Sequence, residues 1–230
     1  MTTIFPTTPS LDRSRIRVGI IDDHALVSET LALVLSEKGF DAVGMNPPDL
    51  DAVAAFAAEN DLHVILLDLN LGELGTSLPL IPRLCDLGYL VIVLTGDTSR
   101  PQWGACIEAG AARVISKAVT FTELLERVTL LLDNVVERHN AEHQELLASL
   151  RKHREEQRER FAPFEQLTER EHEVLLALTR GMTAEEIAAS LFVSMATIRT
   201  HIRAILLKLG VKSQLAAVTL ALRVGGISDA

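Results

Sequence analysis

The chain has 230 residues, of which 23% are charged and only two are cysteines, and its formal net charge is −9. This length suits a domain of roughly 120 residues followed by a smaller one. Cys85 and Cys106 lie in apolar stretches, so both are expected to be small buried hydrophobic residues, and no disulfide framework is implied. No apolar run approaches the ~20 residues of a membrane span, and residues 1–15 have no apolar signal-peptide core. We therefore expect a cytoplasmic protein with no membrane contact and a disordered tail over residues 1–15.

The negative charge is unevenly distributed. Residues 1–138 carry 10 basic and 19 acidic residues, whereas residues 139–160 carry 5 of each and residues 161–230 carry 7 of each. The whole deficit therefore lies in the first part of the chain. Within the last part, residues 194–212 contain four basic residues and no acidic one, which indicates a basic helix face within an acidic protein.

Apolar runs and helical patterns alternate through the first half of the chain. Buried strands are predicted near residues 17–21, 40–45, 63–67, 89–94 and 113–116. Helices are predicted at about residues 25–38, 49–59, 78–87 and 102–109, with a fifth beginning near Thr120. This alternation is typical of a doubly wound α/β domain with a five-stranded parallel sheet. We place that domain at residues 16–135.

Four of these strands end in polar side chains, namely Asp22 with Asp23, Asp68, Thr95 and Lys117. Ligands of an open parallel sheet bind at the carboxyl ends of its strands, so the four ends should converge on one site. Crowded carboxylates favour a cation between them, and hard oxygen ligands suit Mg²⁺. A lone aspartate after a strand is more often a helix cap or a turn former. Four polar ends in this order instead indicate a functional site.

The chemistry of these side chains assigns their roles. Asp68 can attack a phosphoryl donor and carry an aspartyl phosphate. Asp22 and Asp23 would hold the metal. The Thr95 hydroxyl and the Lys117 ammonium would each bind a phosphoryl oxygen. A dinucleotide site is excluded because no G-x-G-x-x-G turn follows the first strand.

The order of acidic pair, aspartate, threonine and lysine resembles the receiver domain of bacterial response regulators. The resemblance spans about residues 16–120 and implies a flavodoxin-like fold. It further implies that the Asn70 carbonyl joins the three aspartates around Mg²⁺, and that Asn70 and Asp97 tune the loss of the phosphoryl group. A phosphatase with an aspartate nucleophile would usually carry a second acid where Asn70 stands. The implied phosphoryl donor is a sensor histidine kinase, and the receiver would catalyse only its own phosphorylation and dephosphorylation.

Two positions depart from the receiver pattern. Val114 stands three residues before Lys117, where receivers commonly have an aromatic residue that moves with the threonine on phosphorylation. Gly72 replaces the proline that is frequent four residues after the phosphoacceptor. Coupling through the usual aromatic switch is therefore an open question in this chain.

A long helix is predicted to link the two domains. Residues 121–161 contain no glycine or proline, and apolar residues recur at helical spacing at Leu125, Val128, Leu132, Val135, Leu146 and Leu150. The linker proper is placed at residues 136–163. Beyond residue 150 the run is almost wholly charged, which leaves open a solvated helix or a dimeric coiled coil.

Residues 164–230 carry the signals of a small all-α domain. Two capping boxes and one further N-cap mark three helix starts, at Thr168 with Glu171, Thr183 with Glu186, and Ser194. A short helix, a turn and then a basic helix predict a helix-turn-helix. The segments LTERE, EIAASL, VSMATIRTH and KLGVKS resemble the DNA-binding domain of LuxR-type regulators, in the branch (NarL/FixJ-like) that joins it to a receiver. That resemblance spans about residues 166–225.

The LuxR-type resemblance implies that the third helix enters the major groove of double-stranded DNA. Base edges would be read by Arg199, Thr200 and Arg203. Phosphate contacts would come from Thr197, His201, Lys208 and Lys212, although His201 could instead pack between helices. Glu185 and Gln214 stand where basic residues are common, so DNA affinity would depend more on dimerisation. The last helix offers a dimer contact through Leu215, Val218 and Leu222.

We therefore expect a homodimeric transcription regulator whose DNA binding is controlled by phosphorylation of Asp68. Two alternatives stay open. In one, the protein binds DNA without phosphorylation and the receiver is a constitutive dimerisation module. In the other, the protein is an interaction adaptor that no longer binds DNA, which the acid-free stretch at residues 194–212 argues against.

Overall fold

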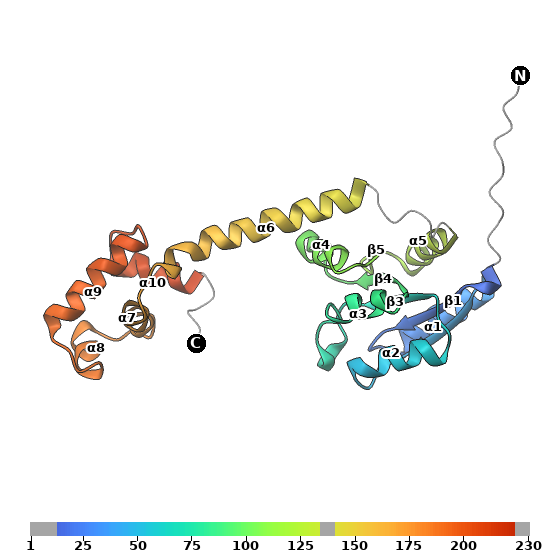
Figure 1. The fold of residues 1–230 in the computed structure, drawn as a ribbon, viewed down its shortest axis with the longest axis horizontal. Coiled ribbons are helices and arrows are strands. Elements are labelled where there is room, and N and C mark those ends of the chain that lie inside the picture. Colours follow the sequence, from blue (N-terminus) through green and yellow to red (C-terminus); the bar gives the residue numbers. More distant parts are fainter. Residues whose placement is uncertain (1–12, 134–140, 224–230) are drawn as a thin grey trace, which may run out of the picture. The chain divides into compact units, whose positions relative to one another are not determined.

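A computed structural model describes residues 13–133 and 141–223 (Figure 1). Most of the predicted tail at residues 1–15 and the start of the predicted linker therefore lie outside the described residues. The chain divides into two compact units, Met1–Arg151 and Lys152–Ala230, and each is described by itself below.

The first unit contains a five-stranded parallel sheet with the strand order β2-β1-β3-β4-β5. The strands are β1 (Arg17–Ile21), β2 (Asp41–Met45), β3 (Val64–Asp68), β4 (Leu90–Thr95) and β5 (Arg113–Ser116). The helices are α1 (Ala25–Glu37), α2 (Leu50–Glu59), α3 (Leu80–Asp86), α4 (Arg100–Glu108) and α5 (Phe121–Asp133), with short 3₁₀ turns η1 (Arg13–Arg15) and η2 (Gly72–Leu74). The predicted doubly wound α/β fold is confirmed.

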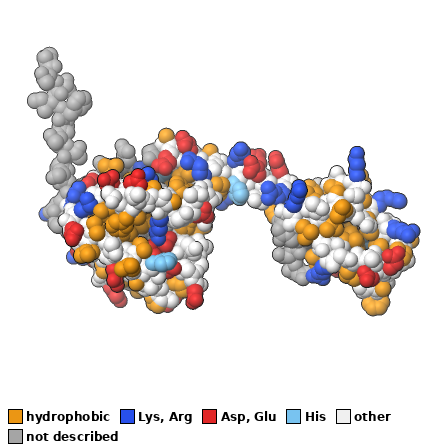
Figure 2. Space-filling view, turned by 180° about the vertical axis from the view of Figure 1, so that it is seen from behind, with side chains coloured by type: hydrophobic (Ala, Val, Ile, Leu, Met, Phe, Trp, Pro, Cys, Tyr) orange, Lys and Arg blue, Asp and Glu red, His pale blue; other side chains and the backbone are white. Residues whose placement is uncertain are grey.

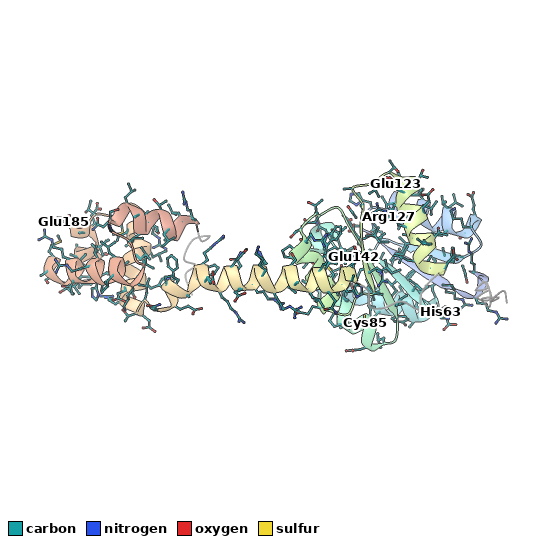
Figure 3. The ribbon with its side chains drawn as sticks, turned by 90° about the horizontal axis from the view of Figure 1, so that it is seen from above. His63, Cys85, Glu123, Arg127, Glu142 and Glu185 are labelled. Carbon is teal, nitrogen blue, oxygen red and sulfur yellow. The ribbon has the colours of Figure 1, made fainter. Side chains whose placement is uncertain are left out.

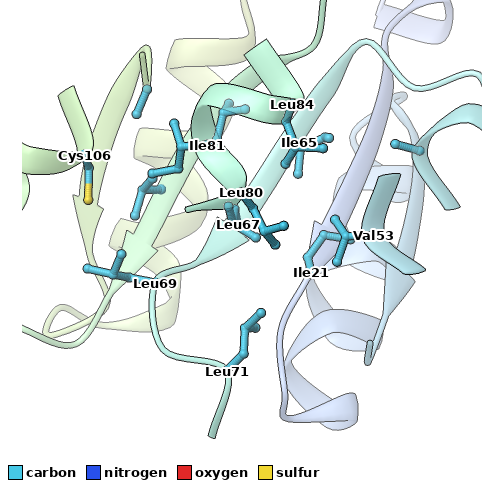
Figure 4. Close-up of a cluster of buried hydrophobic side chains, with 14 of the residues drawn as sticks. Ile21, Val53, Ile65, Leu67, Leu69, Leu71, Leu80, Ile81, Leu84 and Cys106 are labelled. Atoms are coloured by element: carbon cyan, nitrogen blue, oxygen red, sulfur yellow. The ribbon is translucent and has the colours of Figure 1, made fainter. Parts of the chain in front are cut away.

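Side chains of the central strand β3 alternate between two apolar cores, as the two-residue period of a strand requires. Ile65 and Leu67 point into a cluster formed with α2, α3 and α4, part of which Figure 4 shows. Val64 and Leu66 point into a second cluster formed with α1 and α5. Because β3 is covered on both faces, its sequence is a continuous apolar run that ends at Asp68.

The structure describes two helices where the sequence predicts a single one over residues 121–161. The first is α5, and the second is α6 (Ala141–Glu165); residues 134–140 between them lie outside the described residues. The apolar side of α5 packs in the cluster with α1, whereas Leu146 and Leu150 of α6 lie against Gly104 of α4. The two helices thus contact different parts of the first unit, and the continuity of the predicted single helix falls on residues 134–140, outside the described residues. Helical spacing alone does not reveal which face a helix covers.

The second unit is a small helical domain, as predicted. Its helices are α7 (Glu169–Thr179), α8 (Ala184–Ser190), α9 (Met195–Lys208) and α10 (Gln214–Arg223), and the end of α6 joins their core through Phe164. The predicted helix starts are confirmed. Both capping boxes form, with reciprocal bonds in each pair, and the Ser194 side chain accepts from the Thr197 N–H.

Within the described parts of the chain, no single helix is both long and apolar enough to cross a membrane. Helices α8 and α9 pass that test only as a pair, with a bend of 113° between them. Their apolar residues pack in the core of the helical domain.

Candidate functional site

The predicted polar strand ends meet at the carboxyl edge of the sheet. Asp68 and Thr95 are the last residues of β3 and β4, and Asp22 directly follows β1. These three residues are at most 6% exposed. Lys117 follows β5, and its backbone N–H donates to the Thr95 carbonyl at 2.7 Å. Strand register therefore brings the four predicted ends together, as the sequence indicated.

The Lys117 ammonium links two of the carboxylates. Its Nζ donates to Asp22 Oδ2 at 2.5 Å and to Asp68 Oδ2 at 2.6 Å. Two buried carboxylates this close are stable in their charged forms only with a positive charge between them. The sequence pointed to a phosphoryl partner for Lys117 and did not indicate these two contacts.

Burial and the ammonium of Lys117 have opposite effects on the pKa of Asp68. Burial raises the pKa of Asp68 above its usual value, the hydrogen bond and charge of Lys117 lower it, and the charge of Asp22 raises it again, so that the pKa stays raised. The other carboxylate oxygen, Oδ1, accepts a long bond of 3.3 Å from the Asn70 N–H. The wholly buried Ser77 donates to the Asp68 backbone carbonyl at 2.6 Å. Sequence reasoning missed Ser77, because no motif links it to the strand end nine residues earlier.

Asp22, Asp23 and His24 bring ligand atoms within 4.8 Å of one another. Asp22 Oδ1 accepts from the His24 backbone N–H at 2.9 Å, and His24 Nδ1 lies 2.8 Å from Asp23 Oδ1. That hydrogen bond, with the charge of Asp23, raises the pKa of His24. The carboxylate oxygens here are of the type that Mg²⁺ prefers, so the residues present fit a magnesium ion.

Gly72 has a physical reason to replace proline. Its φ is +57°, which proline cannot adopt. A Cβ atom at this position would lie 2.6 Å from Asp23 Oδ2, so a larger residue would have to displace the Asp23 carboxylate, and glycine avoids this.

Asn70 and Asp97 lie on the exposed rim of the same edge. The Asp97 N–H donates to the Thr95 hydroxyl oxygen at 3.0 Å. Asn70 is joined to Thr76 by an isolated β-bridge. Both residues are therefore positioned beside Asp68 and Thr95, where the resemblance leads us to expect them.

Helix α9 has one side buried in the domain core and one side exposed to solvent. Ile198, Ile202 and Ile205 are buried in the domain core. The three predicted base-reading residues, Arg199, Thr200 and Arg203, are all exposed, as is Lys212, while Thr197 and His201 are half-buried. Lys and Arg side chains project from the surface of this unit (Figure 2).

Lys208 differs from the other residues predicted to contact phosphates. Its Nζ donates to Glu171 Oε2 at 2.6 Å, and the two side chains are 30% and 7% exposed. The ammonium thus ties the end of α9 to the start of α7. Glu185, which stands in place of a common basic residue, is exposed on α8 (Figure 3).

Known proteins resemble both units. A model of the response regulator receiver domain matches residues 18–129, and a model of bacterial regulatory proteins of the luxR family matches residues 165–221. The nitrate/nitrite response regulator protein NarP of Escherichia coli (strain K12) is 31% identical over 215 residues, which cover 91% of this chain and 96% of NarP. The chain belongs to the two-component response regulators. Its receiver and its LuxR-type DNA-binding domain are both as the resemblances indicated.

Other response regulators match this one over a similar length. The transcriptional regulatory protein LiaR of Bacillus subtilis (strain 168) is 30% identical over 212 residues, which cover 90% of this chain and 97% of LiaR. Among solved structures, the RcsB response regulator of Salmonella typhimurium is 23% identical, covers 90% of this chain and 98% of that chain, and gives a TM-score of 0.47.

The last helix of this response regulator presents apolar side chains to solvent. On α10, Leu215 and Leu222 are 75% and 58% exposed, whereas Ala217 and Ala221 are buried against the domain core. Val218 is half-buried. The three residues predicted to form a dimer contact are therefore accessible on the domain surface.

Proposed function

We propose that a sensor histidine kinase phosphorylates this response regulator on Asp68, and that the phosphoryl group controls DNA binding. The observation that carries the proposal is the environment of the Asp68 carboxylate. Its Oδ2 is bonded to Lys117, while Oδ1 accepts only a long bond from a backbone N–H among the described residues. Oδ1 is therefore the oxygen with an electron pair to offer to phosphorus.

In the transfer step, Asp68 Oδ1 forms a bond to phosphorus as the P–N bond of the kinase phosphohistidine breaks. The electron pair of that bond returns to the imidazole. Lys117 has three N–H donors, so it can donate a hydrogen bond to a phosphoryl oxygen while it keeps its hydrogen bond to Asp22. The Thr95 hydroxyl donates to another phosphoryl oxygen, and its lone pair still accepts from the Asp97 N–H.

Magnesium supports this chemistry when bound. Asp22, Asp23, Asp68 and the Asn70 carbonyl would hold it, and it would neutralise the charge on the phosphoryl oxygens. The receiver promotes only its own phosphorylation and the later loss of the phosphoryl group.

DNA recognition is assigned to α9 of the domain at residues 164–230. Arg199, Thr200 and Arg203 read base edges in the major groove. Phosphates are contacted by Thr197, His201 and Lys212. Lys208 acts instead through Glu171, because that pair fixes α9 against α7. A second copy of the chain contacts Leu215, Val218 and Leu222, so that a homodimer occupies two half-sites. DNA as the target implies a location in the cytoplasm.

The test is a selection from a pool of random duplex DNA, with and without beryllofluoride and Mg²⁺, which together mimic an aspartyl phosphate. We expect a two-half-site sequence to be enriched mainly in the treated sample. The matched control is Asp68→Asn, which should abolish the difference between the two samples.

Two results would contradict the proposal. Equal enrichment in both samples would indicate a regulator that binds DNA without phosphorylation. No enrichment in either sample would favour the adaptor alternative.

A further inference from the structure

The first ten residues of α6 are docked on the receiver through buried contacts. His143, Leu146 and Leu150 are between 2% and 6% exposed. His143 Nε2 lies 2.8 Å from the Ala112 carbonyl oxygen and 3.0 Å from an Arg113 guanidinium nitrogen, next to the start of β5. This segment of α6 is therefore a packed part of the first unit and not a solvated connection.

Gly104 permits the closest approach between α6 and α4. A glycine in the middle of a helix costs about 1 kcal/mol relative to alanine, so its place in α4 needs a compensating contact. A Cβ atom at this position would overlap the carbonyl oxygen of Leu146 and lie 2.9 Å from Leu150 Cβ. At this position the α4 backbone therefore lies directly against the α6 backbone, and the exposed Arg100–Glu145 ion pair (3.2 Å) is a second contact between the two helices.

The neighbouring residue connects α4 to the phosphorylation site. The indole N–H of Trp103 donates to the Asp97 carbonyl at 2.8 Å, and the Asp97 N–H donates to the Thr95 hydroxyl oxygen at 3.0 Å. Two hydrogen bonds therefore join Thr95 to the residue beside Gly104. Trp103 also packs against the apolar cluster that contains Val114, so an aromatic side chain is supplied from α4 and not from position 114.

We propose that residues 141–150 form a latch on α4 that phosphorylation of Asp68 loosens, and that Trp103 transmits the movement of Thr95 to α4. The inference rests on the function proposed above. When the Thr95 side chain moves towards a phosphoryl oxygen, the Asp97 N–H that stays hydrogen-bonded to its hydroxyl oxygen moves with it. Because the Trp103 indole is hydrogen-bonded to the Asp97 carbonyl, a movement of this loop also moves the start of α4. Because packed helices do not deform continuously, a small shift of Gly104 displaces α6.

The test is hydrogen exchange of the full-length protein with and without beryllofluoride and Mg²⁺. Loading at Asp68 is followed separately by fluorine NMR. We expect amides of residues 141–150 to exchange roughly tenfold faster in the loaded wild-type protein. Loading without any change in these amides would overturn this inference and leave the proposed function standing. Failure to load would overturn both.

Two variants test the parts of the latch. Trp103→Phe keeps an aromatic ring against the apolar cluster but removes the N–H donor together with part of the ring area, so it should load normally while the change in α6 exchange is lost. Gly104→Ala should speed exchange of residues 141–150 even without beryllofluoride, although alanine favours helix α4 itself. A wild-type response in Trp103→Phe would overturn the role of the indole, and slow exchange in unloaded Gly104→Ala would overturn the docking argument. Gln144→Ala, at an exposed position of α6, is the matched control and should behave as wild type.

Discussion

The ion pair between Glu171 and Lys208 should contribute more to stability than an ordinary surface pair. Glu171 Oε2 accepts from Lys208 Nζ at 2.6 Å and from the Thr168 N–H at 2.8 Å. One carboxylate thus completes the capping box of α7 and holds the end of α9. Glu171→Ala removes both interactions and leaves a partly buried ammonium without its partner.

The expected cost follows from these two interactions. Loss of the helix cap costs about 1 kcal/mol, and a hydrogen bond between charged groups is worth about 1.5–3 kcal/mol. Because Lys208 is 30% exposed, we take the lower end, which gives about 2–3 kcal/mol for Glu171→Ala. Glu171→Gln keeps an acceptor for the Thr168 N–H and should cost only about 1–2 kcal/mol. Each 1 kcal/mol lowers the Tm of a domain this small by about 4–8 °C.

The chain offers an internal control for this measurement. Trp103 is its single tryptophan and lies in the receiver, so tryptophan fluorescence follows unfolding of the first unit. Far-UV circular dichroism follows both units. We expect Glu171→Ala and Glu171→Gln to shift a circular dichroism transition and to leave the fluorescence transition in place. Equal costs for the two variants would refute the argument, because the pair with Lys208 would then add nothing beyond the cap.

The same pair gives a pH dependence of known sign. Burial disfavours the charge on Glu171, but the hydrogen bonds from Lys208 and Thr168 outweigh it and hold the pKa of Glu171 below 4.5. A folded-state pKa below the unfolded value adds stability that is complete above about pH 4.5 and is lost as the pH falls through the lowered pKa. Glu171→Gln should lack this acid-dependent loss. A wild-type acid profile in that variant would contradict the assignment.

Three further predictions concern the proposed metal site, the proposed DNA-reading helix and the proposed dimer contact. Gly72→Ala should weaken magnesium binding roughly tenfold, measured by a magnesium titration with beryllofluoride, because its Cβ displaces a carboxylate of the acidic pair. Gly88→Ala is the control, because Gly88 also has a positive φ but no atom lies within 4 Å of a Cβ built there. Weaker magnesium binding in both variants would point to backbone strain alone. Arg203→Ala should cost about 1–3 kcal/mol in binding to the selected DNA with an unchanged circular dichroism spectrum; an unaltered anisotropy titration would remove Arg203 from the base-reading set. Leu215→Ser with Leu222→Ser should weaken DNA binding and leave receiver unfolding as in wild type, and unchanged DNA binding would exclude α10 as the dimer contact.

Much of the fold could be predicted because a parallel strand that is buried on both faces has a continuous run of apolar residues in the sequence. The predicted strand limits near β3 and β4 agree with the observed Val64–Asp68 and Leu90–Thr95 to within a residue. The positions of Asp68 and Thr95 then followed from one topological rule, since each ends its strand. Local rules of this kind also located the capping boxes of α7 and α8.

Contacts that depend on tertiary packing could not be predicted. The spacing of Leu146 and Leu150 marks an apolar helix side but does not reveal that Gly104 lies opposite. Lys208 looks like any other cation on a basic helix until α7 brings Glu171 beside it. Likewise, the hydrogen bond from Trp103 to the Asp97 carbonyl depends on the packing of α4 against the loop before it. The spacing of residues in the sequence does not indicate this packing.

The anchoring of α9 by Lys208 bears on attempts to transplant DNA specificity between regulators. A grafted recognition helix would bring new base-reading side chains on its exposed face, but its tilt in the groove would still depend on the attachment at its last residue. A donor helix without a cation at that point would leave the buried carboxylate of Glu171 without a charge partner and would lose the contact that fixes its end against α7. Under the proposed function, redesign of the target sequence in this scaffold therefore has to retain Lys208 and Glu171, which are not among the residues assigned to read bases.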